Sequence, residues 1–201
     1  MATSLKGRRF PSEVLTHEEV VLLLKSFSRR SPSPVRLAAM CAVAYGGGLR
    51  VGEVLQLRSK DIRKDGTCHI HHGKGDKART VHLNESALAY MDRWRKMRAT
   101  ALKKRGVKSS KYLFCTLSGG PIDPRQIRAA MERAGRHAGL EKRTNFHSLR
   151  HSHAMRLVKG GADMPTLQKN LGHSSLKVTS VYVAHVDNSA LKEASTLIPE
   201  F

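Results

Sequence analysis

The chain of 201 residues is 40% hydrophobic and 5% aromatic, so it can bury the aliphatic core of one domain. Its 36 Lys and Arg residues against 16 Asp and Glu residues give a formal net charge of +20, which predicts a polyanionic partner, with nucleic acid favoured over an anionic membrane surface. There is no apolar run long enough to span a bilayer, no signal peptide, and only three widely spaced cysteines, so we expect a cytoplasmic protein without a disulfide framework or a zinc knuckle.

Helical periodicity dominates the first quarter of the chain. Thr16 and Glu19 have the spacing of a capping box in front of an apolar repeat, which predicts a helix that the stretch "RRSPSP" ends. The mostly apolar segment from Val35 to Tyr45 predicts a buried helix, terminated by the glycines that follow it. A short amphipathic segment comes next.

The middle of the chain predicts one β-hairpin and two helices. The strands are expected at Thr67–His72 and Arg79–Leu83, joined by a glycine-rich turn. Asn84 is then expected to cap a long basic helix that reaches about Lys104. A further helix is expected to start at Pro124 and continue to about Ala138.

The last quarter of the chain is again helical in pattern. The segment 147–158 predicts a helix that ends at two glycines, and two short helices are expected around "MPTLQKNLG" and "LKVTSVYVA", with a possible helix in the tail. The fold class is therefore α+β, mostly helical, with a small antiparallel β-hairpin.

Two basic residues stand beside glycines, where the backbone can approach a ligand closely. Arg50 follows three glycines and could clamp a phosphate with its guanidinium fork, or it could be a surface arginine that pairs with Glu53 three residues on. Lys74 lies between two glycines at the predicted hairpin tip and could protonate a leaving alkoxide, or serve only the solubility of the turn. Taken alone, each residue favours the simpler alternative.

The stretch "HSLRHSHA" places several polar side chains on one predicted helix. His147 and Arg150 share a face because they are three residues apart; His151 joins that face, and His153 is turned away. Zinc binding by the two histidines on the shared face is disfavoured, since no third ligand is evident. A phosphate site and a solvated polar face remain as the alternatives.

A third polar stretch, "LGHSSLKVTSVY", contains His173 and Tyr182. A tyrosine hydroxyl becomes a useful nucleophile when the phosphate that it attacks is neutralised and a base takes its proton. Tyr182 could instead be a half-buried tyrosine at a helix end. The two short helices separated by glycine could also form a helix-turn-helix that reads the major groove of DNA.

Six polar residues in separated stretches of the chain occur in a defined order and spacing. They are Arg50, Lys74, His147, Arg150, His173 and Tyr182. In this order they resemble the signature of the tyrosine recombinase (phage integrase) family, and most of all its Xer-type and phage integrase catalytic domain. The resemblance runs from about Leu15 to His185, which is nearly the whole chain.

The resemblance implies DNA strand cleavage and rejoining through a covalent 3′-phosphotyrosine. Arg50 and Arg150 would clamp the nonbridging oxygens of the scissile phosphate, and His173 would donate a further hydrogen bond. Tyr182 would attack the phosphorus and Lys74 would protonate the leaving 5′-oxygen. The covalent link conserves the bond energy and the cations supply the charge, so neither ATP nor a metal is expected.

Two further site residues are implied by the same resemblance. His147 is the expected partner for the tyrosine proton, directly or by orienting another group. Glu53 resembles the acidic residue that supports the active site of the family, which implies a positioning role.

The resemblance also implies a domain organisation. Residues 1–14 are expected to form a basic tail or linker, 15–186 the catalytic domain, and 187–201 a tail that docks into a neighbour or folds back. Family members usually carry a core-binding domain before the catalytic part, and they act as tetramers on paired sites in double-stranded DNA. A type IB topoisomerase and a non-catalytic helix-turn-helix regulator are the alternative functions.

Overall fold

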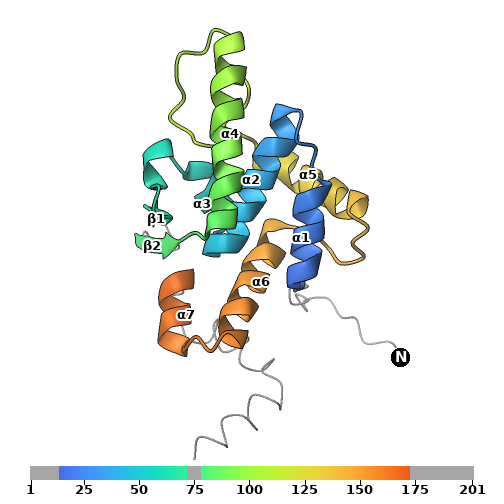
Figure 1. The fold of residues 1–201 in the computed structure, drawn as a ribbon, viewed down its shortest axis with the longest axis vertical. Coiled ribbons are helices and arrows are strands. Elements are labelled where there is room, and N and C mark those ends of the chain that lie inside the picture. The colour runs from blue at the N-terminus through green and yellow to red at the C-terminus, as the bar shows by residue number, and fades with distance from the viewer. Residues whose placement is uncertain (1–13, 72–77, 173–201) are drawn as a thin grey trace, which may run out of the picture.

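The computed structural model describes residues 14–71 and 78–172 (Figure 1). Within these ranges the chain forms seven α-helices, one short 3-10 helix and one antiparallel pair of strands, which confirms the expected mostly helical α+β fold. Helix α2 (Pro32–Gly47) lies at the centre, and almost all of its residues from Val35 to Ala44 are buried. None of the described helices is both long enough and apolar enough to cross a bilayer.

The first two helices begin at sequence signals. Helix α1 (His17–Ser26) has the expected capping box, in which the side chains of Thr16 and Glu19 each bond the other residue's backbone N–H. The prediction for α2 was wrong at its start, because Pro32 and Pro34 lie inside its first turn rather than outside the helix. Proline fits there because the first helical N–H groups have no intrahelical acceptor.

Next along the chain come α3 (Val51–Gln56), the 3-10 helix η1 (Ser59–Asp61), and the strands β1 (Thr67–Ile70) and β2 (Arg79–His82). The strands pair from Thr67 opposite His82 to Ile70 opposite Arg79, so the hairpin is confirmed with shorter strands than expected. The turn that contains Lys74 lies outside the described residues.

The long helix α4 (Glu85–Lys104) crosses α2 and is capped by the side chain of Asn84, as expected. Its inward face carries Met91 and Trp94, and the indole N–H of Trp94 donates to the carbonyl of Leu113 over 2.9 Å. Helix α5 (Pro124–His137) is capped by Asp123 and starts with proline. Both helices confirm the sequence prediction.

Helices α6 (Phe146–Lys159) and α7 (Met164–Leu171) form the lower part of the view in Figure 1. Helix α6 packs against α2, while α7 packs against both α6 and β2. A small apolar cluster of Ala154, Leu167 and Leu171 lies between α6 and α7. This packing brings the ends of α2 and α7 and the start of β2 toward one region of the molecule. The two helices predicted beyond 172 lie outside the described residues.

Candidate active site

The tight turn between α2 and α3 positions the first site residues. Gly48 ends α2 in the left-handed conformation, with φ of 64°, and Arg50 caps α3 immediately afterwards. The backbone N–H of Arg50 donates to Oε2 of Glu53 over 2.8 Å, and its guanidinium Nη1 donates to Oε1 over 2.9 Å. The pairing expected from the spacing of three residues is therefore present, and Arg50 still keeps 29% of its side chain exposed.

Three guanidinium groups from three different elements surround the carboxylate of Glu53. Besides Arg50, Arg79 of β2 makes a bidentate pair, with Nη1 at 2.8 Å from Oε1 and Nη2 at 2.9 Å from Oε2. Nη1 of Arg150 in α6 lies 3.8 Å from Oε2. We call these four residues the arginine cluster. The single negative charge of Glu53 thus lies among three positive charges.

Burial and ion pairing act in opposite directions on Glu53, whose side chain is 4% exposed. Burial raises the pKa of its carboxyl, because the charged form loses water. The hydrogen bonds from Arg79 and from the backbone of Arg50, with the nearby charges of Arg79 and Arg150, outweigh burial and lower the pKa below its ordinary value. Glu53 is therefore a fixed anion at neutral pH.

Arg150 is held by backbone carbonyls. Its Nη1 donates to the carbonyl of Gly48 over 2.6 Å and its Nη2 to that of Leu171 over 2.5 Å, and its side chain is 2% exposed. These bonds join the end of α2 to the end of α7 through α6. The guanidinium is therefore fixed in orientation before any ligand binds.

The histidines of α6 lie as the helical spacing predicted. His147 and His151 face each other, with 2.9 Å between their Nε2 atoms and perpendicular rings. His153 is turned away and buried, with its Nε2 at 2.9 Å from Oδ1 of Asn170. Since a proton can occupy only one side of the His147–His151 bond, one ring donates and the other accepts.

The electrostatics of the histidine pair depend on the arginine cluster. Partial burial lowers the pKa of His147, and the charges of Arg150 and Arg50 lower it further. Burial and the neighbouring His147 lower the pKa of His151 to about 4. Both rings are therefore neutral at pH 7, and a neutral imidazole can accept a proton.

The structure thus brings together four of the seven predicted site residues: Arg50, Glu53, His147 and Arg150. The other three, Lys74, His173 and Tyr182, lie outside the described residues. The described part of the chain contains no group of three or more His, Cys, Asp or Glu side chains arranged to hold a metal ion.

The sequence reasoning missed Arg79, whose guanidinium makes two hydrogen bonds to the carboxylate of Glu53. Its side chain is 7% exposed, and its Nε also donates to the carbonyl of Asn170 over 2.8 Å. A signal was present, since Arg79 opens a predicted strand directly after the basic turn with Lys74. In a chain with so many basic residues, that signal could not be distinguished from a solvent-exposed charge.

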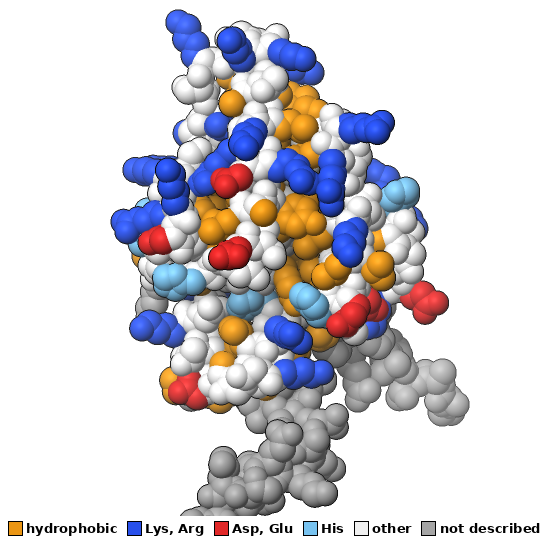
Figure 2. Space-filling view, viewed as in Figure 1, with side chains coloured by type: hydrophobic (Ala, Val, Ile, Leu, Met, Phe, Trp, Pro, Cys, Tyr) orange, Lys and Arg blue, Asp and Glu red, His pale blue; other side chains and the backbone are white. Residues whose placement is uncertain are grey.

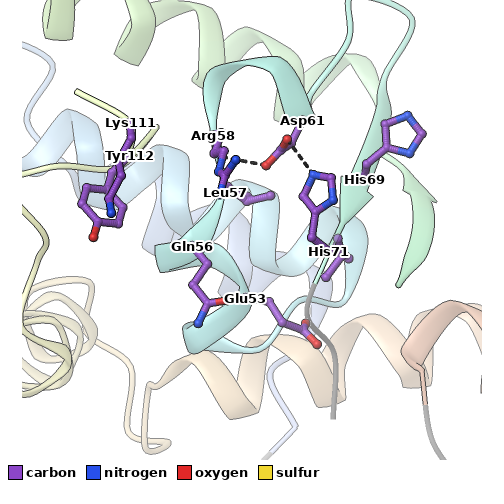
Figure 3. Close-up of a pocket in the computed structure, with 10 residues that line it drawn as sticks. Glu53, Gln56, Leu57, Arg58, Asp61, His69, His71, Lys111 and Tyr112 are labelled. Carbon is purple, nitrogen blue, oxygen red and sulfur yellow. Dashed lines mark hydrogen bonds and ion pairs between the residues drawn. The ribbon is translucent and has the colours of Figure 1, made fainter. Parts of the chain in front are cut away.

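A cavity of about 400 Å³ lies beside Glu53, between α3, η1, β1 and the segment around Tyr112 (Figure 3). Near one end, the carboxylate of Asp61 accepts from the backbone N–H of Arg58 at 2.8 Å and contacts Nε2 of His71 at 2.9 Å. Glu53 lies at the other end of the cavity. Both carboxylates already have partners within the chain, so neither of them is free to act as an acid or base in this cavity.

Residues 13–189 match the phage integrase family, and the chain therefore belongs to this family. Its mostly helical fold with one small hairpin is that of a tyrosine recombinase catalytic domain. The recognised family resemblance is thereby confirmed.

Among curated proteins, the chain is 37% identical over 160 residues to tyrosine recombinase XerC of Bradyrhizobium diazoefficiens, covering 79% of this chain and 48% of that protein. It is 35% identical over 185 residues to tyrosine recombinase XerD of Caulobacter vibrioides, covering 90% of this chain and 60% of that protein. The chain thus spans between about half and three fifths of the length of these two relatives.

Solved structures of recombinases have the same fold as this chain. The crystal structure of XerA recombinase superposes with a TM-score of 0.73 and 27% identity, covering 96% of this chain and 67% of that one. XerH site-specific recombinase, in its post-cleavage complex with palindromic difH substrate, superposes with a TM-score of 0.74 and 30% identity, covering 92% of this chain and 53% of that one.

Proposed function

We propose that the chain is the catalytic part of a site-specific DNA recombinase, which cleaves and rejoins double-stranded DNA through a 3′-phosphotyrosine. The observation that supports this most is the arginine cluster, in which Arg50 and Arg150 meet at one buried carboxylate beside the neutral His147. The relatives named tyrosine recombinase and the XerH complex with difH substrate support the same reaction.

The chemistry follows from the charge that develops at phosphorus. When Tyr182 attacks, the five-coordinate phosphorus gains negative charge on its nonbridging oxygens, and Arg50 and Arg150 stabilise it with hydrogen bonds that strengthen in the transition state. Three arginines against one glutamate leave two net positive charges in the cluster. His173 adds a further hydrogen bond to the same phosphate.

The proton transfers complete the step. His147, neutral and partly exposed, takes the phenolic proton of Tyr182 or orients the group that does, while the new P–O bond forms. The bond between phosphorus and the 5′-oxygen breaks, and Lys74 protonates that oxygen. Attack by a 5′-hydroxyl on the phosphotyrosine reverses these steps and reseals the strand without ATP or metal.

The distribution of charge supports a DNA partner. Lys and Arg side chains spread over α4 and the segments beside it (Figure 2), and the whole chain carries +20. Contacts of this kind to phosphates release counterions, so binding should weaken steeply as salt rises.

We assign the reaction to the cytoplasm and to residues 15–186 of the chain. The proposed assembly is a tetramer on paired sites, in which residues 187–201 contact a neighbour.

The test is covalent capture on DNA. The chain is incubated at low salt with nicked duplexes of randomised sequence, and strands that remain attached after denaturation are sequenced. An adduct at a defined sequence that disappears in Tyr182→Phe supports the proposal. DNA binding by the unaltered chain without any adduct would overturn the enzymatic function and leave the helix-turn-helix regulator.

A second arm separates recombination from relaxation. The chain is incubated with supercoiled plasmids that carry one captured site, two paired sites or none. Recombinant products only from the paired sites support a recombinase. Relaxation of all three plasmids at equal rates would support a type IB topoisomerase instead.

A further inference from the structure

Arg79 connects three elements of the candidate active site. It is the first residue of β2, and its three guanidinium nitrogens all have partners: Nη1 and Nη2 bind Glu53 of α3, and Nε binds the carbonyl of Asn170 near the end of α7. Charge-assisted bonds of 2.8–2.9 Å at a site that is 7% exposed are strong and are only weakly screened by salt. The side chain is therefore a fixed part of the structure.

The contacts at the end of α7 extend this connection. The carbonyl of Asn170 is bound by Arg79, and the next carbonyl, that of Leu171, is bound by Arg150. Gly172 follows with φ of 63°, and a Cβ added there would lie 3.1 Å from Cδ of Arg79. Two arginines thus fix consecutive carbonyls just before Gly172, which directly precedes His173 in the sequence.

The charges around Glu53 give Arg79 a second role. Arg50 also donates to Oε1 of Glu53. Without Arg79, the negative charge of that carboxylate would therefore be neutralised mainly by Arg50. A guanidinium occupied by a carboxylate has fewer donors left for a phosphate. Because Arg79 forms the bidentate pair, Arg50 makes only one side-chain bond to Glu53 among the bonds described.

We propose that Arg79 is a positioning residue, which neutralises Glu53 so that Arg50 and Arg150 keep their charge for a phosphate, and which fixes the end of α7 before His173. This inference rests on the proposed function, since the phosphate is the one that the recombinase would cleave. Arg79 itself acts through Glu53 and the backbone and does not touch the reacting atoms.

The main experiment is a double-mutant cycle of Arg79→Met and Glu53→Gln on a captured DNA site. The rate of adduct formation is measured at saturating DNA, and the dissociation constant for DNA is measured separately. Arg79→Met should slow adduct formation about 10–100-fold, as loss of a residue that orients a metal ligand does, and change DNA affinity by less than about threefold. The double variant removes both charges and avoids leaving a buried anion unpaired.

The cycle distinguishes positioning from simple structural support. If Arg79 acts through Glu53, the two single defects should not multiply, and the double variant, which has no carboxylate left to occupy Arg50, should be no slower than the slower single variant. Arg79→Lys keeps the charge but loses the fork, and it should recover part of the rate. Rates of Arg79→Met within about threefold of the unaltered chain, or defects that multiply fully, would overturn the proposal.

Arg98 provides a matched control. Its Nη2 also binds backbone carbonyls, those of Ser110 and Tyr112, on the far part of α4. Arg98→Met should lower stability without slowing adduct formation at saturating DNA. An equal loss of rate in Arg98→Met and Arg79→Met would mean that the effect is general destabilisation, and it would also overturn the proposal.

If the unaltered chain forms no adduct, that result counts against the proposed function but not against the role of Arg79. A measurement of phosphate binding then tests the role of Arg79 separately. Inorganic phosphate is titrated while the side-chain NMR signals of Arg50 are followed. In Arg79→Met the dissociation constant for phosphate should rise at least about threefold, because Glu53 then competes for Arg50. Equal constants in the two proteins would overturn the role of Arg79.

Discussion

Two groups of side chains on α6 face the same region but have opposite physical characters. Arg150 is 2% exposed, bonded to two backbone carbonyls, and part of a cluster whose charges persist at any physiological pH. His147 and His151 lie on the more open side of the helix, contact each other, and have lowered pKa values. The comparison shows that the permanent charge of Arg150 lies in the interior, where backbone carbonyls hold it, whereas the titratable imidazoles lie where water can reach them.

The largest effect should come from removing either arginine of the proposed clamp. Arg150→Met and Arg50→Met should each slow adduct formation about 10²–10³-fold, by analogy with loss of an oxyanion-hole donor. Only Arg150→Met should also lower the free energy of unfolding, by about 2–3 kcal/mol, because two buried carbonyls lose their donor. Adduct assays and urea denaturation check this; equal stability of the two variants would contradict the difference in burial.

The turn beneath Arg150 should be nearly as sensitive. Gly48 has φ of 64°, and a Cβ there would lie 2.6 Å from Cδ2 of His153. Gly48→Ala should therefore lower the free energy of unfolding by about 2 kcal/mol, from backbone strain and the clash together. It should also slow adduct formation by moving the carbonyl that holds Arg150.

Gly52 supplies the control for that substitution. It lies inside α3, and a Cβ there would meet nothing within 4 Å. Gly52→Ala should be neutral or stabilise the chain by up to about 1 kcal/mol, since alanine is the better helix former. Urea denaturation of both variants gives the comparison, and equal destabilisation would show that the argument from φ is mistaken.

How far the sequence predicted this site depends on the distance between partners along the chain. His147, Arg150 and His151 were placed together correctly because helical spacing is a local property. The pair of Arg79 and Glu53 spans 26 positions, and the bond from Arg150 to Gly48 spans 102. Such partners are set by the packing of α6 and β2 against α2, which no short motif encodes.

The same reasoning explains the fold. Capping signals at Thr16 and Asn84 predicted helix starts correctly, because a cap and its helix are neighbours in the chain. The proline-containing stretch before α2 predicts only the end of a helix, although Pro32 also starts the next helix. Proline limits a helix only from its second turn onward, so its meaning depends on which helix it belongs to.

A smaller effect concerns pH and the histidine pair. The pKa of His151 is about 4 in the folded chain and near 6.5 when unfolded, so the unfolded state binds more protons between these values. Stability should therefore be complete above pH 6.5 and fall as the pH is lowered toward 4. His151→Asn should remove about 1–2 kcal/mol of that fall, after allowance for solvent screening.

Urea denaturation at pH 7 and pH 4.5 measures this dependence in the unaltered chain and in His151→Asn. The unaltered chain should lose more stability between the two pH values than the variant does. The same loss in both would assign the pH dependence to other groups, such as His153, whose pKa is lowered chiefly by burial.

The smallest effect should come from an ion pair with the same geometry in an open place. Nζ of Lys142 lies 2.8 Å from Oε2 of Glu19, the same distance that separates Arg79 from Glu53, but the side chains of Lys142 and Glu19 are 38% and 23% exposed. Water and salt screen this pair, so Lys142→Met should change the free energy of unfolding by less than about 1 kcal/mol and leave adduct formation unchanged. Urea denaturation should give this small value at low salt and a still smaller one at high salt. If Lys142→Met lowered the free energy of unfolding as much as Arg79→Met does, then distance, and not burial, would decide the strength of the ion pairs in this chain.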